Sequence, residues 1–68
     1  MKWKYNPEQG CLEWNGFAIE WVKKDFFDGN IIPAHWMASY GLLVVAVQEE
    51  DMFELMSSCE RLARIMDL

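Results

Sequence analysis

Few side chains in this chain could carry out chemistry. His35 is the single histidine, and the two cysteines are Cys11 and Cys59. A thiol catalyst would pair a cysteine with the histidine, but Cys59 falls on an apolar helical stripe, where a thiol stays protonated. A zinc or iron site would need two or three further ligands, and no cysteine or carboxylate stands at a ligand spacing from His35. We therefore expect neither a catalytic thiol nor a metal site.

The sequence gives little more support for a two-carboxylate catalytic site or a phosphate-binding site. Glu13 and Glu20 are predicted to project from one face of a sheet, which is conceivable for a two-carboxylate site. A chain this short offers no deep cleft, however, and Lys2 and Lys4 are placed to neutralise both acids. Phosphate-binding glycine motifs are absent, because the four glycines fall at turns or caps. The sequence therefore predicts a protein that is not an enzyme and holds no cofactor.

Length and charge narrow the function further. The 68 residues suit one domain spanning 1–68, and eleven acidic against six basic residues give a formal net charge of −5. Nucleic-acid phosphates and anionic lipids are bound by clustered Lys and Arg, so an acidic chain is a poor candidate for either. An acidic surface favours solubility, and it also attracts a basic partner. We expect a protein partner with a basic surface, no direct nucleic acid and no membrane.

Aromatic side chains are abundant for so short a chain. There are four Trp, four Phe and two Tyr, and apolar residues make up 53% of the sequence. Each buried aromatic ring removes about 150–250 Å² from water, so together they could build a core in a small domain. A chain of this length has limited room for ten rings, and some of them are therefore candidates for an interface.

The cysteines and the first residues of the chain indicate the cellular compartment that we expect. Cys11 and Cys59 form no CxxC pair, and residues 1–4 lack the character of a signal peptide. We expect reduced thiols in a cytoplasmic protein, with a single disulfide between the two as the alternative. Residues 31–47 carry no formal charge, but Pro33 and Gly41 disfavour a lipid-facing helix there.

The N-terminal third is predicted to form an antiparallel β-meander. Residues 2–5 alternate polar and aromatic, and Asn15-Gly16 joins two alternating runs, which is the strongest short-range signal of a hairpin. A two-residue turn pairs Trp14 with Phe17 and so sorts the ribbon into two faces. The predicted core face carries Leu12, Trp14, Phe17, Ile19 and Trp21, joined by Trp3 and Tyr5. The opposite face carries Cys11, Glu13, Ala18, Glu20 and Val22.

The rest of the chain is predicted to supply a loop, a short helix, a strand and a long helix. Residues 23–30 read as a connection, and 33–40 as a short helix between Pro33 and Gly41. Residues 42–47 suit a buried strand, with a single helix over 33–48 as the alternative. Apolar residues at three- and four-residue steps predict an amphipathic helix from about 49 to 66.

The predicted fold is therefore α+β. A β-meander of three to four strands packs on one long C-terminal amphipathic helix, with a short helix between them.

Two features could carry binding. The first is acidic and comprises Glu49, Glu50, Asp51 and Glu54, with the hypothesis that it continues over one surface with Asp25 and Asp28. Acidic residues also favour a helix N-terminus, where Asp51 and Glu54 fit a capping box, so this cluster has a purely structural interpretation too. The second feature is the surplus of aromatic side chains, Phe26, Phe27, Trp36 and Tyr40, which either pack in the core or anchor a partner.

In size, acidity and lack of catalytic residues, the chain resembles small phage-encoded inhibitors such as anti-CRISPR proteins and other nucleic-acid mimics. The resemblance involves no specific residues. It implies a small acidic binding protein that docks on a basic, nucleic-acid-binding protein surface and blocks or modulates it. The alternatives are a homo-oligomer, such as a homodimer, held by exposed aromatics or an open strand edge, and a small membrane-associated protein.

Overall fold

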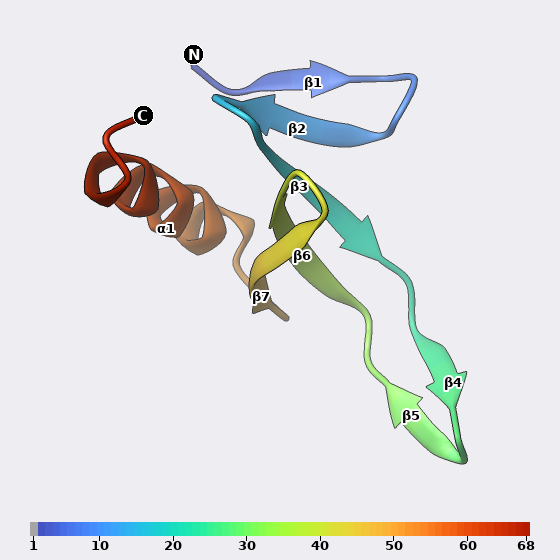
Figure 1. Cartoon of the computed structure of the whole chain (residues 1–68). Coiled ribbons are helices and arrows are strands. Elements are labelled where there is room, and N and C mark those ends of the chain that lie inside the picture. The colour runs from blue at the N-terminus through green and yellow to red at the C-terminus, as the bar shows by residue number, and fades with distance from the viewer. Residues whose placement is uncertain (1) are drawn as a thin grey trace.

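The computed structural model describes residues 2–68, which form seven strands followed by one helix (Figure 1). Five strands make one antiparallel sheet in the order β1-β2-β3-β6-β7, β4 and β5 make a second, two-stranded sheet, and α1 packs on β3, β6 and β7. The predicted α+β class and the C-terminal helix are confirmed. The elements are β1 (Lys4–Asn6), β2 (Cys11–Trp14), β3 (Phe17–Val22), β4 (Asp25–Phe27), β5 (Asn30–Ile32), β6 (His35–Tyr40), β7 (Leu43–Gln48) and α1 (Met52–Ile65).

The turn at Asn15-Gly16 sets the register of the first hairpin. Both residues have positive φ, 51° and 87°, as a type I′ turn requires. The observed pairs are Trp14 with Phe17, Glu13 with Ala18, Leu12 with Ile19 and Cys11 with Glu20. This part of the prediction is confirmed residue by residue, because a two-residue turn leaves the strands no other register.

The predicted short helix over residues 33–40 is wrong. His35–Tyr40 is β6, which pairs with β3 on one side and with β7 on the other. Pairing on both sides satisfies the backbone hydrogen-bonding groups of β6. This outweighs the local helical signal from Pro33 and Gly41. Gly41 has a φ of 62° in a two-residue turn, so the alternative single helix over 33–48 is also wrong. Residues 42–47 do form a strand, β7 over Leu43–Gln48, but the expected burial is wrong, because β7 lies at the sheet edge and Leu43, Val44 and Val47 are exposed.

The predicted connection over residues 23–30 is a second wrong expectation, because half of it, 25–27 and 30, is strand. β4 and β5 extend the β3–β6 hairpin in the same register, since the pairs Val22–His35 and Asp25–Ile32 lie three residues apart on both strands. A turn at residues 28–29 closes the ribbon. The large sheet has five strands because β6 joins it, and β4 and β5 add two more in the second sheet, so the protein has more strands than the predicted three to four.

The core lies between one face of the large sheet, here called the inner face, and α1. Phe17, Ile19 and Cys59 are the largest fully buried side chains. Trp14 stacks on Phe17 with ring centroids 6.1 Å apart, and Leu12 packs partly buried against the same cluster. Tyr5 and Trp21 depart from the prediction, because 65% and 46% of their surfaces remain exposed. Cys11 departs in the opposite sense: it was expected on the outward face and is buried.

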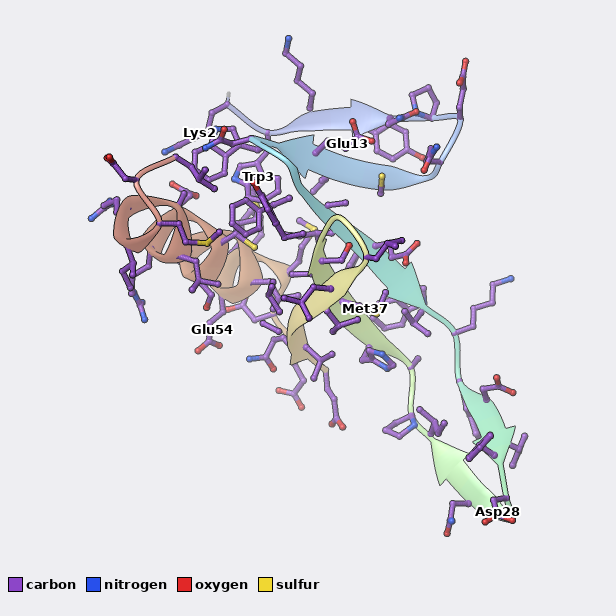
Figure 2. All side chains as sticks on the ribbon, viewed as in Figure 1. Lys2, Trp3, Glu13, Asp28, Met37 and Glu54 are labelled. Atoms are coloured by element: carbon purple, nitrogen blue, oxygen red, sulfur yellow. The ribbon has the colours of Figure 1, made fainter. Side chains whose placement is uncertain are left out.

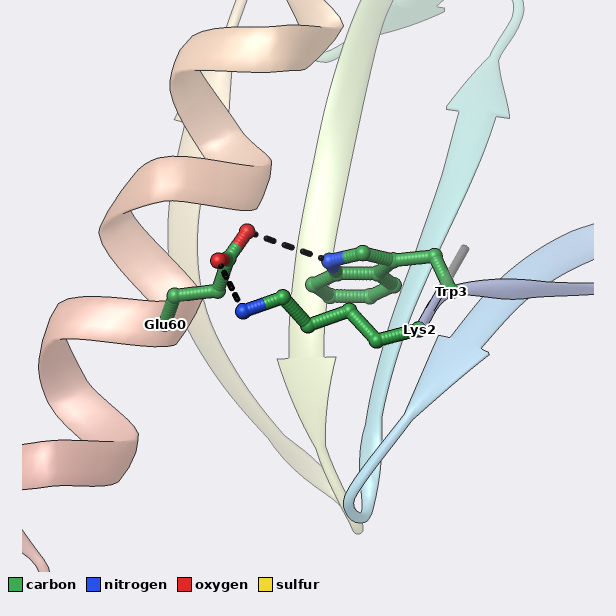
Figure 3. Close-up of polar contacts among 3 residues, drawn as sticks. All are labelled: Lys2, Trp3 and Glu60. Atoms are coloured by element: carbon green, nitrogen blue, oxygen red, sulfur yellow. Dashed lines mark hydrogen bonds and ion pairs between the residues drawn. The ribbon is translucent and has the colours of Figure 1, made fainter.

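A polar clasp holds the N-terminal segment against α1 (Figure 3). The buried Trp3 donates a hydrogen bond from Nε1 to Oε2 of Glu60 at 3.3 Å, and Nζ of Lys2 lies 2.7 Å from Oε1 of the same carboxylate. Lys2 was expected beside the sheet acids, but the helix carboxylate takes it instead, while Lys4 lies opposite Glu13 as predicted. The clasp joins the two ends of the sequence across the core.

Gly16 is expected to tolerate a side chain less well than Gly10. Both have positive φ, where an alanine costs about 1–2 kcal/mol. A Cβ on Gly16 would also lie 2.7 Å from Cε2 of Tyr40, whose ring packs on Phe17, whereas a Cβ on Gly10 meets nothing within 4 Å. We expect Gly16→Ala to lower the free energy of unfolding by about 1–3 kcal/mol more than Gly10→Ala, measured by urea denaturation. Equal losses of unfolding free energy in the two variants would show that the Tyr40 ring moves aside without cost.

The clasp should make stability depend on pH. Lys2 first, and Trp3 second, hold the pKa of Glu60 below its ordinary value, so folding favours the charged carboxylate. Its stabilisation is therefore complete above the ordinary carboxyl pKa and is lost as the pH falls through the lower, folded-state pKa. We expect Glu60→Gln to lower the unfolding free energy at neutral pH and to approach wild type in acid.

Urea titrations at a series of pH values measure this, with Glu8→Gln as the matched control on an exposed turn residue. A deficit of Glu60→Gln that stays constant across the acidic range would contradict the assignment.

Candidate functional site

The β4–β5 ribbon projects from the body of the molecule as an arm, defined here as residues 25–32 (Figure 1). Within residues 2–68, β4 and β5 contact each other and no other element. The longest dimension of the molecule is 41 Å, and the Cα radius of gyration is 12.7 Å against about 11 Å for a compact chain of this length. The arm thus lies outside the packed core.

Four large apolar side chains are exposed on the arm. Phe26 and Phe27 expose 66% and 72% of their surfaces, and Ile31 and Ile32 across the ribbon are exposed as well. Phe26 pairs with Ile31, whereas Ile32 pairs with Asp25, so apolar side chains project from both faces. Nζ of Lys24 lies 5.8 Å from the ring centroid of Phe26, at the base of the arm.

The two isoleucines were missed by the sequence-based reasoning, which placed them before a helix. The signal was available, because Asp28-Gly29 stands between two apolar pairs, and Asp-Gly in that setting predicts a hairpin. Asp28 and Gly29 have φ values of 52° and 79°, as a type I′ turn requires.

The predicted acidic residues fall into two separate groups. Glu49, Glu50, Asp51 and Glu54 are exposed together at the junction of β7 and α1. Asp25 and Asp28 are exposed on the arm, and Figure 2 shows Asp28 at its tip, far from Glu54 beside the helix. The structure therefore does not join the six into one continuous surface.

Two acids at the β7–α1 junction have local structural roles. Asp51 is the N-cap of α1, and its side chain accepts a hydrogen bond from the Phe53 amide at 2.9 Å. Glu54 accepts a hydrogen bond from Nε2 of Gln48 at 2.9 Å rather than completing the predicted capping box. The structural interpretation of this cluster therefore has direct support.

Trp36 and Tyr40 occupy different positions from the two arm phenylalanines. Both are half-buried and pack against the core. Tyr40 lies 4.9 Å from Phe17 between ring centroids, and Trp36 makes an edge-to-face pair with Trp21, also at 4.9 Å. The tryptophan pair lies on the inner face near the base of the arm.

An apolar groove opens beside this tryptophan pair. Its volume is about 300 Å³, and it lies beside the first residue of α1, Met52, which lines it together with residues of the sheet. A larger, shallow concavity of about 530 Å³ lies near the Asn15-Gly16 turn and includes Lys2, Lys4 and Glu13. The groove is lined by Tyr5, Gly10, Cys11, Leu12, Ile19, Trp21, Trp36 and Met52.

The residues first considered for catalysis are held in structural contacts. Burial raises the pKa of both thiols, Cys11 and Cys59, and nearby carboxylates raise them further, so both stay protonated at neutral pH. Neither forms a disulfide. Nδ1 of His35 lies 2.9 Å from the carbonyl oxygen of Pro33. Across residues 2–68, no three metal-ligating side chains come together, and no helix is long and apolar enough to cross a membrane.

Comparison with known protein families, with curated proteins and with solved structures finds no match to this chain. The arm and the tryptophan groove at its base are therefore identified as the candidate site on geometry alone.

The arm should be dispensable for folding. Because β4 and β5 contact no other element in the described chain, replacing residues 23–34 by Asn-Gly would close Val22 and His35 with a type I′ turn. We expect the shortened protein to keep its circular dichroism spectrum and to change its unfolding free energy by no more than about 1 kcal/mol, since removing surface residues away from packed features rarely costs more. Loss of cooperative unfolding would show that the arm supports the core.

Proposed function

We propose that this protein is a non-enzymatic binding module that docks its arm into a site on a partner protein and thereby blocks or modulates that partner. The observation that carries the proposal is the exposure of Phe26, Phe27, Ile31 and Ile32 on an element that contributes nothing to the core. An isolated two-stranded ribbon is at best marginally stable in water, and exposed apolar groups gathered on one element mark interaction sites. Burial in a partner would stabilise the ribbon and remove its apolar side chains from water.

The charges on the arm favour a basic partner. Asp25 and Asp28 flank the two phenylalanines, and the arm carries no basic residue. With a net charge of −5 on the whole chain, a partner whose groove is rimmed by Lys and Arg would be attracted over long range and held in register at the rim. A basic surface that normally binds nucleic acid fits this description, and docking there would compete with the nucleic acid.

The groove beside the tryptophan pair offers a second contact. Trp21 is 46% exposed at the base of the arm, and together with Trp36 it lines the apolar groove. Tryptophan and tyrosine are frequent energetic anchors in interfaces because they bury a large area at low entropic cost. A partner that engages the arm along its length would reach this pair. The proposed binding surface therefore runs from the arm tip to the tryptophan groove.

Affinity capture with the arm-shortened protein tests this proposal. We expect wild type to retain a specific partner, and expect Phe26→Ser/Phe27→Ser to weaken its Kd by about 30-fold or more, since loss of a hot-spot aromatic costs about 2 kcal/mol or more. Replacement of residues 23–34 by Asn-Gly should abolish retention. Kd values are measured by titration calorimetry with the purified partner.

Charge variants supply the matched control. Asp25→Lys/Asp28→Lys should weaken binding and reduce its salt dependence, whereas Glu8→Lys, on the turn between β1 and β2, should leave both unchanged. A partner that binds the arm-shortened protein as tightly as wild type would refute the proposal.

A further inference from the structure

One edge of the large sheet is left open. β7 pairs with β6 on one side, and its other side pairs with no strand in residues 2–68. β7 is six residues long and contains no charged residue, proline or glycine. The opposite edge, β1, is only three residues long and includes Lys4. Natural sheets protect open edges with charges, short strands, proline or bulges, because an unpaired edge is a template for another strand. β1 is protected by its short length and its charge, whereas β7 has neither and carries only a bulge.

An irregularity in β7 changes which way its side chains face. The register of β7 against β6 shifts between Ala38 and Ser39, which leaves Val45 as the extra residue of a bulge. Val45 and Ala46 are both half-buried and both pack against the core. Val44 and Val47 are 52% and 60% exposed. They lie opposite Ser39 and Met37, on the face of the sheet that α1 does not cover, here called the outer face.

The order in which the β7 side chains face the inner and outer sides of the sheet is the same when the strand is followed in either direction. Leu43 and Gln48, at the two ends, pair with Tyr40 and Trp36, whose side chains are on the inner face. From Leu43 to Gln48 the residues therefore face inner, outer, inner, inner, outer, inner. A strand without the bulge alternates strictly, so a six-residue segment would read differently from its two ends.

We propose that β7 pairs antiparallel with β7 of a second copy of this chain, about a two-fold axis that passes between Val45 and Ala46 and perpendicular to the sheet. Each residue then meets a residue on its own face: Val44 lies opposite Val47 of the second copy, and Val45 lies opposite its Ala46. Directly opposite side chains in paired strands must share a face. The bulge satisfies this condition for an axis between two residues, whereas a strictly alternating strand satisfies it only for an axis that passes through one residue pair. The two five-stranded sheets would continue as one sheet.

The charges near β7 favour this antiparallel arrangement. Glu49, Glu50 and Asp51 directly follow β7. In the proposed pairing, Glu49 lies beside residue 42 of the second copy, so the two acidic segments are roughly 20 Å apart along the strands. That separation exceeds the Debye length of about 8 Å at physiological salt, and their repulsion is screened. Parallel pairing would place them about 5 Å apart, on neighbouring strands.

The size of the contact sets its strength. Six residues on each side bury less than the about 1,200–2,000 Å² of a standard stable interface. We therefore expect a dimer that forms at high micromolar concentration and dissociates on dilution. This interface is separate from the arm, so a dimer would still present two arms to partners.

Sedimentation velocity over a concentration series tests the pairing and its register. We expect wild type to pass from monomer to dimer. Val44→Lys/Val47→Lys places lysine opposite lysine at two symmetric positions and should leave only monomer. Val44→Lys/Val47→Glu places lysine opposite glutamate twice and should restore the dimer, because opposite charges on directly paired residues attract. Both positions are exposed in the single chain, so the variants should keep the wild-type circular dichroism spectrum.

Ile31→Lys is the matched control, since it puts the same charge on an exposed apolar residue of the arm. It should leave the dimer intact. A wild-type monomer at every concentration, a dimer that survives Val44→Lys/Val47→Lys, or a dimer lost in Ile31→Lys would each overturn the proposal. Failure of the Val44→Lys/Val47→Glu variant to recover the dimer would overturn the proposed register.

Discussion

One helix has to cover the inner face of a five-stranded sheet. α1 has fourteen residues, so it is about 21 Å long, and it contacts β3, β6 and β7 but not β1 or β2. Trp3 fills the core beside the helix, and its hydrogen bond to Glu60 fixes the N-terminal segment there. Where this cover ends, apolar surface stays exposed, as at Trp21 and along the groove beside it.

The same shortage of cover explains why this small chain exposes so many large apolar side chains. A chain of this length buries only about 60% of the surface that its unfolded form exposes. The core uses Phe17, Ile19 and the residues around Cys59. The arm lies beyond the reach of α1, whereas β7 contacts α1 but turns Val44 and Val47 to the uncovered outer face at the sheet edge. Exposure at these two places is thus a consequence of topology: the β3–β6 hairpin outgrows the sheet, and no strand follows β7 in the sheet order.

Charge is distributed so that these apolar surfaces remain distinct. The acids at the β7–α1 junction cap the helix and bond to Gln48, and those on the arm flank Phe26 and Phe27. β7 itself carries none. An apolar arm with an acidic rim and a neutral strand edge present different chemistry, so they suit different partners. The protonated thiols and the core-packed Tyr40 belong to the scaffold that holds both surfaces in place.

The sequence by itself determined what depends on neighbouring residues: the register at Asn15-Gly16, the amphipathic helix with its Asp51 cap and the α+β class. For residues 42–47 it left a strand and a continuing helix as alternatives. It also marked Phe26 and Phe27 as unusual for a connection. Only the tertiary structure decided that His35–Tyr40 is a strand, because pairing with both β3 and β7 outweighs a helical pattern bounded by Pro33 and Gly41. It also decided how far α1 reaches and where the bulge at Val45 turns β7, since these follow from contacts between segments distant in sequence, which local periodicity does not encode.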